Sequence, residues 1–266
     1  MPDIRAIILG SGSSGGVPRV GNDWGRCDPE NPKNRRSRCG LYLEVTDERN
    51  SHHVLIDTPP DLREQLLRNQ ISRVDSVLFT HTHADQCHGI DDLRVLAYAQ
   101  RKRMPVFADK ISFEELFVRF RYCFQTPEGS SYPPILDAQP EIEAGKAFKL
   151  DNFVNVLPLD QDHGSVRSLG FRIGNFAYCN DVVDLPAESL NALKGLDVFI
   201  IDALRYEPHP THANVSQALA WADLLKPKMT VLTNLHVDLD YEELRQQLPK
   251  NVVPAYDGMT IDSFFP

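Results

Sequence analysis

The chain has 266 residues, 42% of them hydrophobic and 24% charged, and its formal net charge of −9 disfavours nucleic acid as a general partner. No apolar run approaches the roughly 20 residues that span a bilayer, and residues 1–10 lack the basic start and long apolar core of a signal peptide. We therefore expect one cytoplasmic domain over residues 1–266, with no membrane partner.

Short apolar runs bounded by Gly, Asp, Asn, Thr or Pro predict β-strands along the whole chain. In chain order, the predicted strands are residues 4–9, 41–45, 54–56, 74–79, 106–108, 154–159, 169–173, 176–179, 198–201 and 229–232. Helical periodicity predicts helices at residues 61–69, 91–103, 112–124, 186–193, 214–225 and 241–248. Strands dominate early and alternate with helices later, which predicts an α/β (α+β) fold of mixed sheets covered by helices. Residues 127–134 form the clearest long loop, and such loops often cover sites.

The segment after the predicted strand 74–79 carries the clearest chemistry. It contains His81, His83 and Asp85, each separated from the next by one residue. Two imidazoles two positions apart at a strand exit can converge on one cation, and the carboxylate can reach an adjacent one. The alternative is three unrelated polar loop residues, but this spacing at a strand exit is rare by chance. We therefore predict a metal site here.

Other predicted strands also end at potential ligands: His163, Asp181, Asp202 and His236. Each alone is explained equally well as a turn residue or a cap. Together they form a His/Asp set at one edge of the sheets, and such a set suits Zn²⁺, Mn²⁺ or Fe. His52 and His53 precede a strand, so we expect them on the surface.

The chain resembles the metallo-β-lactamase superfamily in the order and spacing of its candidate ligands and of two segments. These are His81, His83, Asp85, His163 and Asp181, with residues 9–15 and 233–236. Within this superfamily, the chain is most similar to the phosphoribosyl cyclic phosphodiesterases of phosphonate catabolism, and tRNase Z is a more distant resemblance. The resemblance implies a four-layer αββα sandwich, with two mixed β-sheets flanked by helices and a metal site at one edge.

The resemblance also implies a site for two ions. The first would be held by His81, His83, His163 and Asp181, and the second by Asp85, Asp181 and two further histidines. In such sites the ions activate a water molecule and clamp the phosphoryl group. Asp85 and Asp181 would orient that water.

Further roles follow for residues around the ions. His212 matches the family's general acid, although it is also explained as a residue at the start of the helix 214–225. Asp202 is either a partner that holds a ligand histidine or a strand-end cap. Composition suggests phosphate binding by residues of basic clusters. The candidate substrate-binding residues are Arg35, Arg36, Arg94 and His88.

The chain departs from the family pattern at two positions. Gln86 and Asn234 stand where the family has histidines, and both would belong to the second ion. Three interpretations are open: a weak or hard ion bound through amide oxygens, replacement by His88 and His236, or loss of the second ion together with catalysis. We favour a strong first site and a weak or absent second one.

The five cysteines are odd in number and include no Cys-x-x-Cys pair, which argues against a disulfide framework. Some relatives hold a structural zinc with several cysteines near the N-terminal loop. Here that loop supplies Cys27 alone, so we predict no structural zinc.

We therefore predict a Mn- or Zn-dependent phosphodiesterase that acts on a small cyclic or nucleotide-like phosphodiester. The alternative is a degenerate, non-catalytic homologue that binds a nucleotide or phosphosugar. RNA 3′-end processing is disfavoured by the acidic charge and by the lack of an obvious inserted RNA-binding arm. The relatives also suggest a homodimer.

Overall fold

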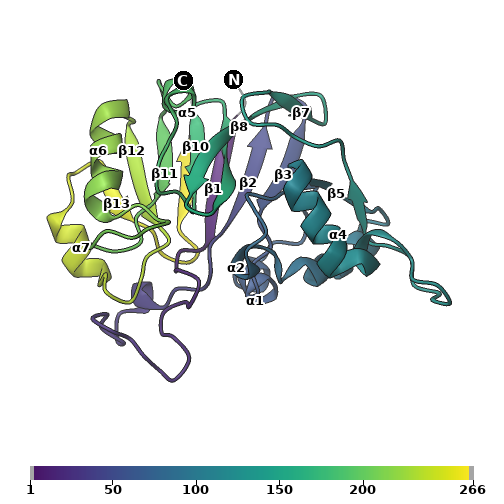
Figure 1. The fold of residues 1–266 in the computed structure, drawn as a ribbon, viewed down its shortest axis with the longest axis horizontal. Coiled ribbons are helices and arrows are strands. Elements are labelled where there is room, and N and C mark those ends of the chain that lie inside the picture. The colour runs from purple at the N-terminus through teal and green to yellow at the C-terminus, as the bar shows by residue number, and fades with distance from the viewer. Residues whose placement is uncertain (1–2, 264–266) are drawn as a thin grey trace.

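A computed structural model describes residues 3–263 and contains two seven-stranded β-sheets with helices on their outer faces (Figure 1). In spatial order, the first sheet contains β14 (Thr260–Ser263), β1 (Asp3–Gly10), β2 (Gly40–Thr46), β3 (Ser51–Ile56), β4 (Ser76–Leu78), β5 (Met104–Phe107) and β6 (Leu136–Ala138). The second contains β13 (Val252–Pro254), β12 (Met229–Thr233), β11 (Val198–Asp202), β10 (Phe176–Cys179), β9 (Val166–Ile173), β8 (Val154–His163) and β7 (Phe148–Leu150).

The helices divide between the two sheets. The helices that follow strands of the first sheet are α1 (Leu62–Arg68), α2 (Ala84–Cys87), α3 (Leu93–Ala99) and α4 (Lys110–Phe124). The second sheet carries α5 (Ala187–Ala192), α6 (Val215–Leu225) and α7 (Tyr241–Gln247). Two short 3₁₀ helices, Pro32–Asn34 and Ile90–Asp92, lie in loops.

Each sheet is half parallel. Strands β3 to β6 pair in parallel in the first sheet, and β10 to β13 do so in the second. Parallel strands place their carboxyl ends at one edge of a sheet, where ligand-binding loops collect. The loops that carry most of the predicted ligands therefore start from that edge.

Strand alternation builds three apolar layers. On β11, Val198 and Ile200 face the core between the sheets, while Phe199 and Ile201 face the core under the helices of the second sheet. A third core lies between the first sheet and α1, α3 and α4. Because both faces of these strands are buried, their sequences are continuous apolar runs. The predicted αββα sandwich of two mixed sheets is confirmed.

The sequence prediction missed the shortest elements. Strands β6, β7 and β13 have three residues each, too few to show an alternating pattern. Strand β14 and helix α2, with four residues each, were also missed. Helix α3 ends at Ala99, earlier than predicted, and Arg101 just beyond it adopts a left-handed φ of 52°. His52 is buried within β3, not on the surface, and its Nε2 lies 2.9 Å from Ser76 Oγ.

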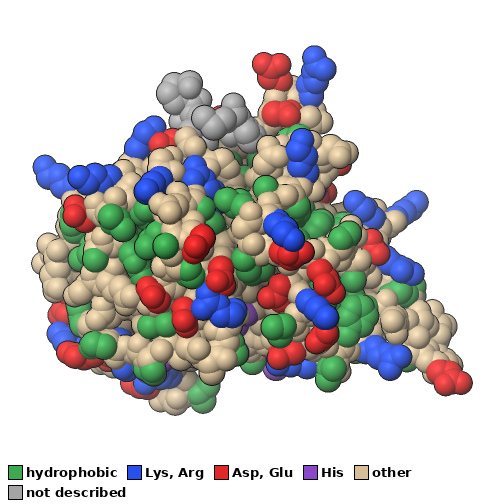
Figure 2. All heavy atoms as spheres, turned by 45° about the horizontal axis from the view of Figure 1, so that its top comes forward, with side chains coloured by type: hydrophobic (Ala, Val, Ile, Leu, Met, Phe, Trp, Pro, Cys, Tyr) green, Lys and Arg blue, Asp and Glu red, His purple; other side chains and the backbone are tan. Residues whose placement is uncertain are grey.

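The surface shows no large area of one charge on the face in Figure 2, where basic and acidic side chains are intermingled with apolar ones. The loop 127–134 lies beside α3 and α4 and lines a pocket with Arg94, Tyr98 and Tyr122. None of the helices within residues 3–263 has the length and apolarity needed to cross a bilayer.

A buried carboxylate ties the loops around the sheet edge together. Asp257 accepts hydrogen bonds from the backbone N–H and hydroxyl of Ser11 (3.0 and 2.9 Å) and of Ser37 (2.8 and 2.6 Å). Its Oδ2 also lies 3.2 Å from Arg68 Nη1. Burial raises the pKa of Asp257, but the hydrogen bonds from Ser37 and from the Ser11 hydroxyl, together with the charge of Arg68, oppose that shift. The loops after β1, before β2 and before β14 therefore meet at one side chain.

We expect Asp257→Ala to lower the free energy of unfolding by about 3 kcal/mol, because it leaves several buried donors without an acceptor. Urea unfolding of the metal-free protein, followed by circular dichroism, measures this loss. The exposed Asp223→Ala on α6 is the control, with an expected change within about 0.5 kcal/mol. A loss below about 1 kcal/mol for Asp257→Ala would show that water replaces the carboxylate.

Candidate metal centre

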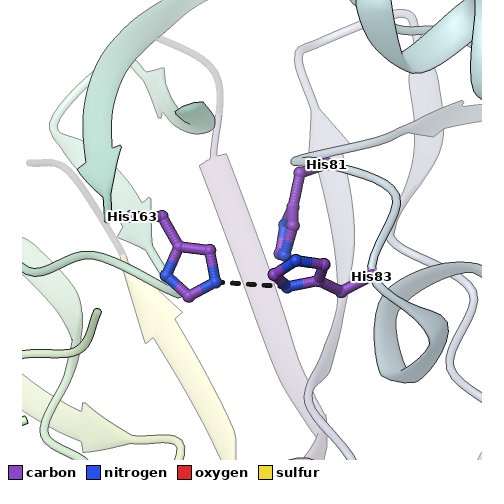
Figure 3. Close-up of side chains that lie close together, drawn as sticks. All are labelled: His81, His83 and His163. Atoms are coloured by element: carbon purple, nitrogen blue, oxygen red, sulfur yellow. Dashed lines mark hydrogen bonds between the residues drawn. The ribbon is translucent and has the colours of Figure 1, made fainter. Parts of the chain in front are cut away.

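Three histidines from two different sheets converge at the edge described above (Figure 3). His81 and His83 lie in the loop between β4 and α2, and His163 ends β8. Their candidate ligand nitrogens all lie within 4.8 Å of one another, with His163 Nε2 3.2 Å from His83 Nδ1. His81 Nε2 is buried and has no hydrogen-bond partner. A buried, unpaired imidazole nitrogen facing two others fits a bound cation, and an all-imidazole set suits Zn²⁺ or Mn²⁺.

Hydrogen bonds behind the rings set the tautomers. His163 Nδ1–H donates to the carbonyl oxygen of Thr211 at 2.7 Å. His81 Nδ1 lies 3.0 Å from Thr80 Oγ1 and can donate to it. In both rings Nε2 is therefore the nitrogen with the free lone pair. Burial lowers the pKa of His81 well below its usual range and that of His163 to about 4, so both rings are neutral at pH 7.

Asp57 is a functional candidate that the sequence analysis missed. It directly follows β3, is fully buried, and accepts hydrogen bonds from the backbone N–H and the hydroxyl of Thr80, both at 2.8 Å. It thus orients Thr80, which in turn orients His81. Burial raises the pKa of Asp57 to about 8. The signal that could have found it is an Asp directly after the predicted strand 54–56.

Three strand exits at this edge share an uncommon backbone conformation. Asp57, Asp181 and Asn234 have φ angles of 65°, 51° and 63°. The left-handed region is costly for most side chains, but Asp and Asn tolerate it best. Asp57 and Asn234 directly follow a strand and Asp181 lies one residue further on, and in each case the turn holds the side chain at the sheet edge.

Asp181 lies beside the three histidines, with Oδ2 3.9 Å from His81 Nε2. Side-chain amides surround its carboxylate: Gln86 Nε2 (2.8 Å) and Asn180 Nδ2 (3.0 Å) donate to Oδ2, and Asn234 Nδ2 (3.1 Å) donates to Oδ1. Gln86 Nε2 also lies 3.3 Å from Asp85 Oδ2. The predicted ligands Asp85 and Asp181 are thus linked through Gln86.

A second titratable pair adjoins the cluster. His212 Nδ1 lies 2.7 Å from Asp202 Oδ2, and its ring centroid lies 4.7 Å from that of His163. Burial lowers the pKa of His212, but the Asp202 carboxylate outweighs this effect and the pKa rises to about 9. Asp202 also caps the backbone N–H of Val182 at 3.1 Å. Asp202 is therefore both a cap and the partner of His212, which forms a second candidate ion-binding group with His163 and Asp181.

Two predicted histidines lie outside the groups that could hold an ion within residues 3–263. The exposed His88 packs its ring against Phe120, with centroids 5.6 Å apart. His236 Nδ1 lies 2.7 Å from Asp238 Oδ2, and Nε2 contacts Arg19. The structure therefore gives no support to His88 or His236 as replacement ligands.

The predicted arginines occupy three different environments. Arg36 is fully buried, where it donates to Asn34 Oδ1 (3.1 Å) and to the carbonyl of His236 (3.3 Å). Arg35 is exposed and stands over the Trp24 ring at 5.1 Å. Arg94 pairs with Asp91 in a pocket that contains none of the clustered histidines. Of the three, Arg35 is the one placed on an exposed loop.

We expect Thr80→Val to weaken binding of the first ion about 10- to 100-fold, because it removes the oxygen that orients His81. Competition with a chelating dye measures Zn²⁺ affinity. The matched control is Thr230→Val, which removes a buried hydroxyl that has no partner. Equal affinities for both variants would mean that the Asp57–Thr80–His81 chain does not support the ion.

Comparison with known proteins identifies the family of the chain. The family profile of the beta-lactamase superfamily domain matches residues 52–234. A solved diphosphatase from the PhnP family is 34% identical, with a TM-score of 0.88, and the match covers 98% of this chain and 97% of that chain. The octanoyltransferase of Porphyromonas gingivalis is 34% identical over 261 residues, which are 96% of this chain and 51% of that protein. The chain thus spans about half the length of this curated relative.

Two more distant structures share the fold. Zn²⁺-bound PqqB from Methylobacterium extorquens has a TM-score of 0.72 at 16% identity, and the match covers 97% of this chain and 100% of that chain. The short form of human tRNase Z has a TM-score of 0.66 at 16% identity, covering 97% of this chain and 98% of that chain. The resemblance predicted from the sequence is confirmed, and the chain belongs to the beta-lactamase superfamily of metal-dependent hydrolases and, within it, to the PhnP family.

Proposed function

We propose that the chain is a metal-dependent phosphodiesterase-type hydrolase that cleaves a phosphodiester or diphosphate bond in a small cyclic or nucleotide-like substrate. The observation that carries this proposal is the set of three converging imidazoles, with His81 Nε2 buried and unpaired, beside the His212–Asp202 pair. The diphosphatase activity in the name of the PhnP family structure supports the substrate class. The transferase activity named for the relative twice as long is not part of the proposal.

His81, His83, His163 and Asp181 would hold one Zn²⁺ or Mn²⁺ tightly. Such an ion supplies Lewis-acid polarisation of a phosphoryl oxygen and makes water nucleophilic at neutral pH. Imidazole ligands favour these metals over Mg²⁺ or Ca²⁺, and the related fold of PqqB contains Zn²⁺.

Side chains of the protein would orient the attacking water and protonate the leaving group. Asp85 would accept a hydrogen bond from the attacking water and orient it, and Asp181, which is linked to Asp85 through Gln86, would help to position Asp85. His212 keeps its proton at neutral pH because Asp202 holds Nδ1, which leaves Nε2 to donate to the oxygen of the leaving group. His81 and His163 are buried whereas His83 is exposed, so substrate reaches the cluster from the side of His83.

A small phosphorylated substrate is a better candidate than a nucleic acid. The net charge of the chain is −9, which disfavours binding of a polyanion. The exposed residues Arg35 and His88 are the candidates for binding the substrate phosphate, whereas buried Arg36 supports the loop that carries Arg35.

A binding protein without turnover is the second candidate. It is favoured by the amides of Gln86 and Asn234, which occupy both oxygens of Asp181. Protein loaded with excess Mn²⁺ or Zn²⁺ separates the two functions. Tight binding of nucleotides without hydrolysis would contradict the hydrolase and leave the binding protein.

Hydrolysis should require the ion and be lost after chelation, with bis(p-nitrophenyl) phosphate and nucleoside diphosphate sugars as test substrates. We expect His212→Ala to lower kcat about 100- to 1000-fold for substrates with an alkoxide leaving group, because general acid catalysis contributes that much. The loss should be much smaller for p-nitrophenolate, which leaves without protonation.

The control for this prediction is the ion content of the His212→Ala protein, which should match that of the native chain. Asp202→Asn should reproduce the dependence on the leaving group in weaker form. If His212→Ala lowers kcat equally for both leaving groups, His212 is not the general acid.

A further inference from the structure

Both protons of each of two side-chain amides point at carboxylates in the buried edge of the site. Gln86 Nε2 donates to Asp181 Oδ2 (2.8 Å) and Asp85 Oδ2 (3.3 Å). Asn234 Nδ2 donates to Asp181 Oδ1 (3.1 Å) and Asp202 Oδ1 (3.1 Å). These are the two positions at which the family resemblance implies histidine ligands for a second ion.

We infer that the amides of Gln86 and Asn234 replace the second metal ion, so that the site of this chain holds one ion. The inference rests on the proposed first ion site. We call the four hydrogen bonds that these amides make to Asp85, Asp181 and Asp202 the amide clamp.

Counting lone pairs on Asp181 supports the amide clamp. A carboxylate offers about four lone-pair sites. Gln86, Asn180 and Asn234 use three of them. Gln86 and Asn180 take both lone pairs of Oδ2, so the one that remains is on Oδ1 and can serve one ion at most. A carboxylate that bridges two ions needs a free lone pair for each.

The orientation of the amide dipoles also supports replacement of the second ion by the amides. A histidine ligand presents a lone pair to an ion, whereas these amides present N–H hydrogens to the carboxylates. A cation between them would meet the positive ends of the N–H dipoles. Turning either amide over would set its oxygen against two carboxylate oxygens, which is electrostatically unfavourable.

The surroundings hold the amides in place. Gln86 is fully buried, and its backbone is fixed because its N–H donates to His83 O at 3.0 Å and its backbone carbonyl accepts from Thr58 N–H at 2.7 Å, whereas its side-chain Oε1 has no partner. Asn234 is 2% exposed and lies in the tight turn after β12. The amide clamp therefore separates three carboxylates that would repel one another without a cation.

The test uses the whole chain and Mn²⁺ or Zn²⁺ alone. Chelator-treated protein is titrated with each ion, ion content is measured by elemental analysis, and Mn²⁺ is also observed by electron paramagnetic resonance. We expect the native chain to bind one ion with the spectrum of isolated Mn²⁺. The double variant Gln86→His/Asn234→His should bind a second ion and give the spectrum of a spin-coupled pair.

The matched control is Gln246→His/Asn191→His, which adds two histidines at exposed positions and should leave one ion per chain. Gln86→Glu is a second variant that keeps the side-chain shape but removes both N–H donors and adds a negative charge. This substitution should lower the Tm of the ion-free protein, and excess Mn²⁺ should restore that Tm. It tests the amide clamp even if the double variant does not fold.

A native chain that binds two spin-coupled ions would overturn the amide clamp. A folded double variant that still binds one ion, or a Gln86→Glu protein whose Tm does not respond to Mn²⁺, would also overturn it. These outcomes are independent of the proposed function. An inactive native chain with one ion refutes the hydrolase and supports the amide clamp. An active native chain with two coupled ions supports the hydrolase and refutes the amide clamp.

Discussion

The packing of the two sheets against each other is the constraint on which the site depends. His81 and His83 follow a strand of the first sheet, and His163 ends a strand of the second, so their nitrogens meet only if the inner faces are in register. The core between the sheets contains residues of both, such as Leu43 and Phe171, and it sets that register. Close-packed interiors move little, so the packing keeps the three imidazoles together.

Buried polar side chains behind the histidines then set their orientation. Asp57 holds Thr80, and Thr80 holds His81, while the carbonyl of Thr211 holds His163. Such outer contacts tune the strength of a metal site as much as the ligands do. The left-handed turn at Asp57 carries a conformational cost that its two hydrogen bonds from Thr80 offset.

The two sides of the site differ in how they handle charge. On the histidine side, neutral imidazoles leave a buried nitrogen unpaired, which favours an ion. On the amide side, Gln86 and Asn234 satisfy the carboxylates without one. Under the proposed function, a site with this asymmetry would rely on His212 and Asp202, rather than on a second ion, to balance charge at the leaving group.

The sequence by itself determined the longer strands and helices and the edge at which the chemistry lies, and its resemblance to a family implied the αββα sandwich. Continuous apolar runs mark strands that are buried on both faces, and the His81, His83 and Asp85 spacing is local. It also identified Gln86 and Asn234 as departures. Only the tertiary structure decided which way their amides point, that Asp57 supports His81, that Asp202 pairs with His212, and that Arg36 is buried. These facts depend on contacts between residues far apart in the chain, and local periodicity carries no information about such contacts.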